Sequence, residues 1–237
     1  MDISKKGLQD DMSAEVMNLL TLKSSGILWL QASDEANKSA FIDTIEGGSV
    51  PLEHAGFRLP EELLVVKYHI EPNIHPSWFA DHVKDDLSSK IGVSAGQKPL
   101  PYARTEMTRA PDPQQEMIRT LEEWQRIANH FRGQSPILIC LDGLENISRP
   151  EDGHWNIADF IPAPGDLPEG IFFVMTSKPK KELPSWLSEQ LTAQLPGVDE
   201  RSYKTNGSEQ LAPRDNPTAA PSITPKKKLS TPRPKGP

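Results

Sequence analysis

Short apolar runs of strand length recur along the chain, with longer amphipathic stretches between them. The runs predict four strands, at residues 27–31, 63–69, 137–141 and 171–176. Three of the four are almost continuously apolar, which is typical of parallel strands buried on both faces. The pattern therefore predicts an α/β fold, in which a parallel sheet of about four to five strands is covered by helices on both faces.

Apolar positions at helical spacing predict four helices, at residues 37–45, 77–91, 114–131 and 183–195. Pro76 and Pro113 mark the start of two of them. The predicted order is β-α-β-α-α-β-α-β-α, in which a helix also separates the third and fourth strands. Residues 92–113 are rich in Gly, Pro and polar side chains without a period, which indicates an irregular surface segment.

The pattern ends near residue 195. Residues 197–237 are rich in Gly, Ser, Asn, Pro and charge, so they cannot bury enough apolar area to offset the entropy of ordering. We predict a helical lead-in at 1–19, one core domain at 20–196 and a disordered tail at 197–237. A fifth strand would have to come from residues 198–204, which are polar.

Composition places the chain among soluble proteins. Of its 237 residues, 36% are hydrophobic and 25% charged, and no apolar run approaches the ~18 residues of a membrane span. The N-terminus lacks the apolar core of a secretory signal, and the single cysteine, Cys140, can make no intramolecular disulfide. We therefore expect a cytoplasmic protein without membrane contact.

The net charge of −7 is unevenly distributed. Residues 1–196 carry 18 basic and 29 acidic side chains, whereas residues 197–237 carry 8 and 4. An acidic body argues against a nucleic-acid surface, which needs clustered basic side chains. The basic tail, with Lys226, Lys227 and Lys228, could serve as a localisation signal or contact an acidic partner, or it could simply be solvated.

The predicted strand at 137–141 delivers a carboxylate, Asp142, to its carboxyl end, where open parallel sheets bind ligands. One carboxylate can anchor Mg²⁺ beside phosphates, because Mg²⁺ keeps several waters. Glu145, three residues on, could orient or deprotonate a water that attacks a phosphoryl group. The alternative is that Asp142 only caps the loop that follows it.

Residues 135–146 resemble the Walker B motif of STAND-class P-loop NTPases, particularly NACHT-like domains: four apolar residues, Asp-Gly, an apolar residue and two acids. Asn146 stands in place of the second acid. Residues 161–179 resemble the family's loop, strand and Thr-Ser-Arg-Pro ending, with Lys178 in place of Arg. The resemblance covers residues 20–195.

The resemblance implies a phosphate-binding loop after the first strand. Lys38 and Ser39 match G-x-x-x-x-G-K-[ST], but Ala32 and Asn37 occupy the two glycine positions. Such a loop turns backbone N–H groups toward phosphate, with glycine supplying positive φ. Asn tolerates the left-handed region better than Ala does, so Ala32 is the worse substitute.

Two acids, Asp34 and Glu35, also lie in this loop. Each like-charge contact with phosphate would cost about 3 to 4 kcal/mol at ~4 to 6 Å and an effective dielectric of ~20, if the side chain pointed inward. The sequence therefore favours weak nucleotide binding or none.

The resemblance assigns roles to particular residues. It implies ATP or GTP with Mg²⁺ as cofactor, contacts to nucleotide from Ala32, Asn37, Lys38, Ser39, Thr176 and Lys178, metal ligands at Ser39 and Asp142, and catalysis by Glu145. Family members carry a helical lid and repeats after this core and an effector domain before it, and a core without them suggests a truncated or repurposed switch.

Three hypotheses remain open. The first is a degenerate STAND-type module that regulates or binds proteins in signalling or immune defence, a pathway that the resemblance alone implies. The second is a working Mg²⁺-dependent ATPase or GTPase switch, and the third is a platform that acts through its basic tail. Protein partners are expected, and the oligomeric state stays open. His69, His75 and His82 have no metal-ligand spacing and predict ordinary hydrogen-bonded side chains.

Overall fold

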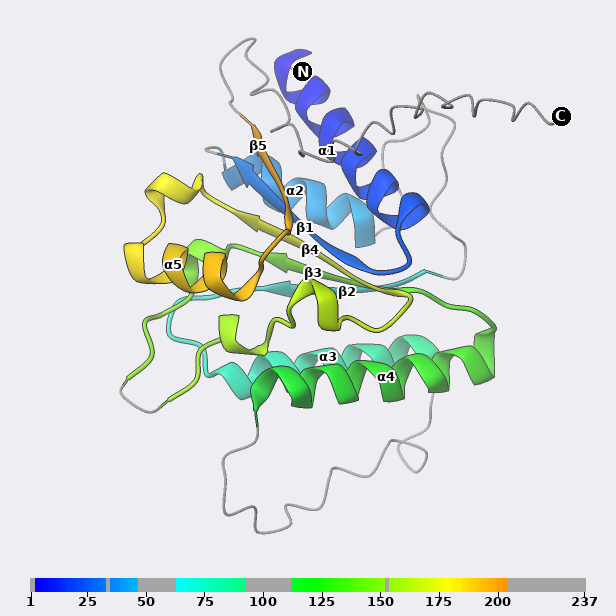
Figure 1. The fold of residues 1–237 in the computed structure, drawn as a ribbon. Helices are drawn as coiled ribbons and strands as arrows, with labels where there is room; N and C mark the ends of the chain where they lie inside the picture. Colours follow the sequence, from blue (N-terminus) through cyan, green and yellow to red (C-terminus); the bar gives the residue numbers. More distant parts are fainter. Residues whose placement is uncertain (1–2, 33–34, 47–62, 93–111, 152–153, 204–237) are drawn as a thin grey trace, which may run out of the picture.

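Five parallel strands form a single sheet in the computed structural model, which describes residues 3–32, 35–46, 63–92, 112–151 and 154–203 (Figure 1). The strand order is β2-β3-β4-β1-β5. The strands are β1 Gly26–Ala32, β2 Leu64–His69, β3 Ile137–Asp142, β4 Ile171–Ser177 and β5 Asp199–Tyr203. The prediction of an α/β fold with a parallel sheet is confirmed, and β5 lies in the polar segment named as the candidate fifth strand.

Helices cover both faces of the sheet (Figure 1). One face packs against α1 Ile3–Leu22 and α2 Glu35–Glu46, and the other against α3 Pro76–Ile91, α4 Pro113–Arg132 and α5 Ser185–Gln194. Strand alternation explains this, since Leu28 and Leu30 belong to the α1–α2 core while Ile27 and Trp29 belong to the opposite one. β1, β3 and β4 are buried along their whole length, as the apolar runs predicted, whereas β5 is partly exposed.

Local signals fix the helix ends. Asp112 caps α4 by accepting a hydrogen bond from the Gln114 N–H at 3.0 Å, and Pro113 occupies the first helical position. His75 caps α3 in the same way, with Nδ1 accepting from the Ser77 N–H at 3.3 Å. The helices run opposite to the strands they cover, so their amino ends lie at the carboxyl edge of the sheet and their carboxyl ends at the amino edge.

One predicted element is wrong. No α-helix separates β3 from β4 in the described residues 143–151 and 154–170, which contain only short 3₁₀ turns: η3 Leu144–Asn146, η4 Ala158–Phe160 and η5 Pro164–Asp166. Prolines at 150, 162, 164 and 168 explain this, because proline removes a backbone donor and clashes with the preceding turn. A further 3₁₀ turn, η6 Lys180–Glu182, follows β4.

The described part of the chain extends beyond the expected core at both ends. Helix α1 runs on to Leu22, past the expected lead-in, and packs against β1, while β5 continues the sheet past residue 196. The prediction of a disordered tail from residue 197 is wrong for residues 199–203, which form β5 and pair with β1. The rest of that tail, 204–237, and most of the predicted irregular excursion, 93–111, lie outside the described residues. Within the described residues no helix is long and apolar enough to cross a membrane.

Candidate functional site

The carboxyl edge of the sheet brings most of the predicted site residues together. Asp142 and Thr176 end adjacent parallel strands, since Leu141 pairs with Met175 in the register of β3 and β4. Lys38 and Ser39 reach this edge from the first turns of α2, which follows β1. Residues that lie more than 100 positions apart in the chain thus form one polar cluster, which we call the carboxyl-edge cluster: Lys38, Ser39, His69, Asp142, Glu145 and Thr176.

Asp142 lies at the centre of this cluster and is 2% exposed. Its Oδ1 accepts from the Thr176 hydroxyl at 2.5 Å, and its Oδ2 accepts from the Ser39 hydroxyl at 2.7 Å. The Nδ1 of His69 lies 3.0 Å from the same Oδ2. A buried carboxylate is tolerated only when donors surround it, and here three side chains supply them.

Lys38 is almost fully buried, with 1% of its surface exposed. Its ammonium group donates to the backbone carbonyl of Ala32 at 2.8 Å and lies 3.5 Å from Oε1 of Glu145. A buried ammonium needs such partners, because an unpaired charge out of water is costly. The lysine that the motif assigns to phosphate is therefore bound to the end of β1 and to an acid of the same chain.

Glu145 connects Lys38 to the end of β4. Its Oε2 accepts from the Lys178 backbone N–H at 3.1 Å, while Oε1 faces Lys38. The glutamate sits on η3 directly after Gly143, which has a φ of 86°. Both carboxylate oxygens of the predicted catalytic residue are thus engaged within the protein.

Asn146 occupies the position where the family has a second acid, and the structure gives it a different role. Its Nδ2 donates to the Ile70 carbonyl at 2.9 Å and so ties η3 to the end of β2. A carboxylate could not donate this bond. An added Cβ at Gly143 would lie 2.9 Å from that Nδ2, so the turn and the amide contact depend on each other.

His69 is the member of the cluster that the sequence did not reveal. It ends β2, and the register of β2 and β3 places it directly beside Asp142. In the sequence, both His69 and Asp142 stand at the end of an apolar run, which places both at the same edge of the sheet. Their pairing depends on the register between two strands some 70 residues apart, which the sequence does not show. The other two histidines have separate partners, since His75 caps α3 and His82 Nε2 lies 2.7 Å from the Lys67 carbonyl.

The remaining predicted loop residues are only partly described. Asn37 lies within α2, and the side chains of Asn37 and Glu35 are outside the described set. Ser33 and Asp34 are also outside it. The prediction that the loop acids oppose phosphate therefore stays a prediction.

A neighbouring group of polar residues extends the edge toward β5. The buried amide of Gln31 accepts from the Lys180 backbone N–H at 2.9 Å and donates to Glu200 at 3.2 Å. The Lys180 ammonium lies 3.1 Å from Glu200 and 5.2 Å from the centre of the Trp29 ring. This side of the edge is also hydrogen-bonded within the chain.

The oxygen pair of Ser39 and Asp142 fits a hard cation. Adjacent ligands of octahedral Mg²⁺, at 2.0–2.1 Å from the ion, are about 2.9 Å apart, and the two side-chain oxygens are 2.7 Å apart. These residues would hold Mg²⁺ if it bound, with phosphate and water completing its shell. Among the described residues, no group of three or more His, Cys, Asp or Glu side chains is arranged to hold a metal ion.

No protein-family model matches the chain, and a search of curated proteins finds no significant match. Membership in the STAND class therefore remains a prediction from the two motif blocks.

Proposed function

We propose that the chain is a degenerate STAND/NACHT-like module that binds nucleotide weakly or not at all and acts as a regulatory or protein-interaction domain. The proposal rests mainly on the contacts of the Lys38 side chain. Its buried ammonium group is held by Ala32 and Glu145, so a phosphate would have to replace a hydrogen bond and an ion pair before gaining the same charge.

Three further observations support the proposal. The acceptors of Asp142 are used by Ser39, Thr176 and His69, so a metal must displace at least one of these donors. Glu145 is held by the Lys178 backbone N–H rather than left to position a water. Ala32 stands at a glycine position, and its carbonyl is part of the lysine contact.

A working Mg²⁺-dependent ATPase or GTPase is the second candidate, and the 2.7 Å separation of the Ser39 and Asp142 oxygens favours it. In that case Lys38 would turn from Glu145 to the β and γ phosphates. Ser39 and Asp142 would hold the ion, Lys178 would contact the γ-phosphate, and Glu145 would orient the attacking water. Mg²⁺ would supply charge neutralisation on the transferred group.

Thermal denaturation of the full chain with Mg·ATP or Mg·GTP separates the two candidates. A ligand at 100 times its Kd stabilises the folded state by about 2.7 kcal/mol. We expect a stabilisation below about 0.5 kcal/mol at millimolar nucleotide in the wild type, and no larger one in Lys38→Ala measured against its own ligand-free Tm. A wild-type shift that disappears in Lys38→Ala would overturn the proposal and support the enzyme.

A further inference from the structure

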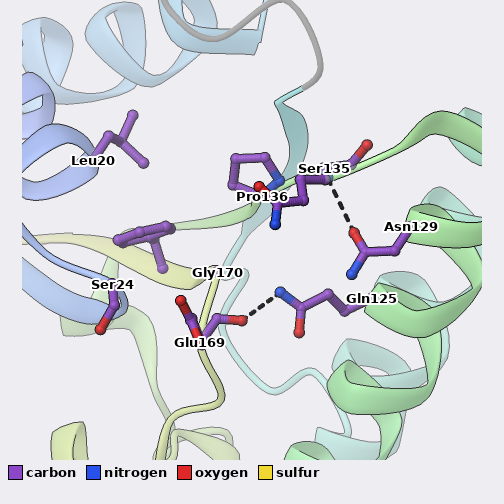
Figure 2. A pocket seen from close by; sticks show the side chains of 10 residues that line it. Leu20, Ser24, Gln125, Asn129, Ser135, Pro136, Glu169 and Gly170 are labelled. Carbon is purple, nitrogen blue, oxygen red and sulfur yellow. Dashed lines mark hydrogen bonds between the residues drawn. The ribbon is translucent and has the colours of Figure 1, made fainter.

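The amino edge of the sheet, opposite the carboxyl-edge cluster, contains a cavity of about 520 Å³. Figure 2 shows it between the end of α1, which contributes Leu20, and the last turns of α4, which contribute Gln125 and Asn129. Its floor is formed where β3 and β4 begin, at Pro136 and Gly170. The volume lies within the range of small-molecule sites, about 300–1,000 Å³.

The polar residues that line the cavity are neutral or acidic. Three carboxamide residues, two serines and one glutamate line the cavity: Gln125, Asn129, Gln134, Ser24, Ser135 and Glu169. None of the described residues that line it is Lys, Arg or His. The cavity is therefore unsuited to a phosphate or another anion, and this separates it from the function that the sequence motifs suggest.

Two helix ends lie at the same edge. Helix α1 ends at Leu22 and α4 at Arg132 (Figure 1). A helix carboxyl end carries a partial negative charge of roughly half an electron, but the basic residues Lys23 and Arg132 stand at these two ends in the sequence. The preference for a positively charged ligand therefore comes from the exposed carboxylate of Glu169 and from the carboxamide oxygens.

Some lining groups are used within the chain and others are not. The Gln125 amide nitrogen donates to the Glu169 carbonyl, and the Asn129 Oδ1 accepts from the Ser135 N–H at 3.1 Å, as the dashed lines in Figure 2 show. These contacts orient both carboxamides from α4. The Ser135 hydroxyl has no hydrogen-bond partner among the described residues, but its oxygen is fully covered, so it does not open to the cavity.

The cavity also has an apolar side. Leu20 and Phe172 extend the apolar core beneath α1 to the cavity wall, and Pro136 lies between them and the α4 carboxamides. An aliphatic stem would bury apolar area there. A ligand with a positive head and an apolar stem thus matches both walls.

We propose that this cavity binds an organic cation, a guanidinium or ammonium group on an aliphatic stem. The head group donates hydrogen bonds to Glu169 and to the carboxamide oxygens, and the stem lies against Leu20 and Phe172. Such a cation could be a free amine or guanidine, or the basic side chain of a partner protein. The proposal is independent of the proposed nucleotide chemistry at the opposite edge.

Isothermal titration of the full chain with butylguanidine, and with uncharged butylurea as the matched probe, tests this inference. We expect butylguanidine to bind and butylurea to bind at least about tenfold more weakly, because charge-assisted hydrogen bonds are the stronger kind. Glu169→Gln should weaken butylguanidine about tenfold. Glu189→Gln, which removes an exposed acid from α5, should leave its Kd unchanged, as should Lys38→Ala.

Binding of neither probe at millimolar concentration would overturn the proposal, and so would equal binding of the two or an equal effect of Glu169→Gln and Glu189→Gln. A second variant, Gln134→Ala, removes one of the lining carboxamides and should weaken butylguanidine severalfold. N-acetyl-arginine N-methylamide distinguishes the sources. Binding about tenfold tighter than butylguanidine indicates a basic side chain of a protein partner, and equal or weaker binding indicates a free cation.

Discussion

The two edges of the sheet differ in how their polar groups are used. At the carboxyl edge, Lys38, Asp142 and Glu145 are charged residues that a motif assigns to nucleotide, and each is engaged by other groups of the chain. At the amino edge, neutral carboxamides and the carboxylate of Glu169 surround a cavity that a ligand could enter. The first edge has the recognisable residues, while the second has unused hydrogen-bonding capacity.

This difference separates two kinds of evidence for a binding site. A motif reports which residue types are present, whereas ligand capacity depends on how much of their hydrogen bonding the fold has already used. By that criterion the carboxyl-edge cluster stabilises the protein as it stands, and the amino-edge cavity is the better candidate for an added ligand. The stabilities of variants at the two edges test this difference.

The largest effect is expected from Asp142→Ala. Removing this carboxylate leaves the donors of Ser39, His69 and Thr176 without their acceptor, and we expect the free energy of unfolding to fall by about 3 kcal/mol. Urea denaturation measures this change in the free energy of unfolding. Asp166→Ala, which removes an exposed acid on η5, should stay within about 0.5 kcal/mol.

A higher free energy of unfolding in Asp142→Ala would contradict this difference between the two edges of the sheet. Active sites often hold charges at the expense of stability, so removing one commonly stabilises the fold. That result would show that the carboxyl edge is a strained functional site, and that its internal hydrogen bonds do not stabilise the fold.

An intermediate effect is expected from Asn146→Asp. The substitution restores the acid of the family motif, but it replaces the donor to the Ile70 carbonyl with a carboxylate. We expect a loss of about 1 to 3 kcal/mol in the free energy of unfolding. Asn129→Asp is the matched change at the other edge, where the side chain accepts from the Ser135 N–H, and a carboxylate can still accept.

Asn129→Asp should therefore cost less than about 1 kcal/mol, most of it from an anion near the carboxyl end of α4. It should also tighten butylguanidine binding severalfold, since it adds negative charge to the cavity. Equal losses in the two Asn→Asp variants would show that the donor and acceptor roles assigned here are wrong.

The smallest effects are expected where a buried hydroxyl lacks a partner. Ser135→Ala and Tyr203→Phe each remove such a group, so without ligand we expect unfolding free energies from unchanged to about 1 kcal/mol higher. Neither variant should change cation binding, because the Ser135 hydroxyl is fully covered and Tyr203 ends β5, away from the cavity. A clear destabilisation by Ser135→Ala would indicate that its hydroxyl is satisfied in solution.

Tyr203 also gives a pH signature. Burial raises the pKa of its phenol, and Glu15 and Asp11 raise it further. Above pH ~10 the unfolded chain loses this proton while the folded chain keeps it, so stability falls as pH rises. Denaturation from pH 9 to 11 should show a shallower loss in Tyr203→Phe, and an unchanged slope would contradict the burial of this hydroxyl.

Periodicity sufficed for most of the fold because the strands are buried on both faces. β1, β3 and β4 were predicted to within one residue at each end, because Gly26, Pro136 and Gly170 precede the three apolar runs and polar residues follow them. The wrong helix between β3 and β4 arose where apolar residues are frequent but proline controls the backbone. β5 carried a weak signal because an edge strand of charged residues has no apolar run.

The site was predictable only as far as strand ends define it. Asp142, Lys38 and Ser39 follow buried strands, and parallel strands bring their carboxyl ends together. The contact of Lys38 with Glu145 depends on a side-chain conformation, and that of His69 with Asp142 on strand register. The cavity was missed because its lining comes from α1, α4, β4 and three loops, and the two motif blocks that contribute residues 135–136 and 169–172 point to the opposite edge of the sheet.

Titration of the full chain with Mg·ATP, compared with Glu145→Gln, tests the central claim most directly. If Lys38 is held by Glu145, the wild type should bind in the millimolar range or not at all and show no hydrolysis. Glu145→Gln, which removes one opposing charge, should bind about tenfold more tightly. Micromolar binding with hydrolysis in the wild type, and loss of hydrolysis in Glu145→Gln, would contradict the account.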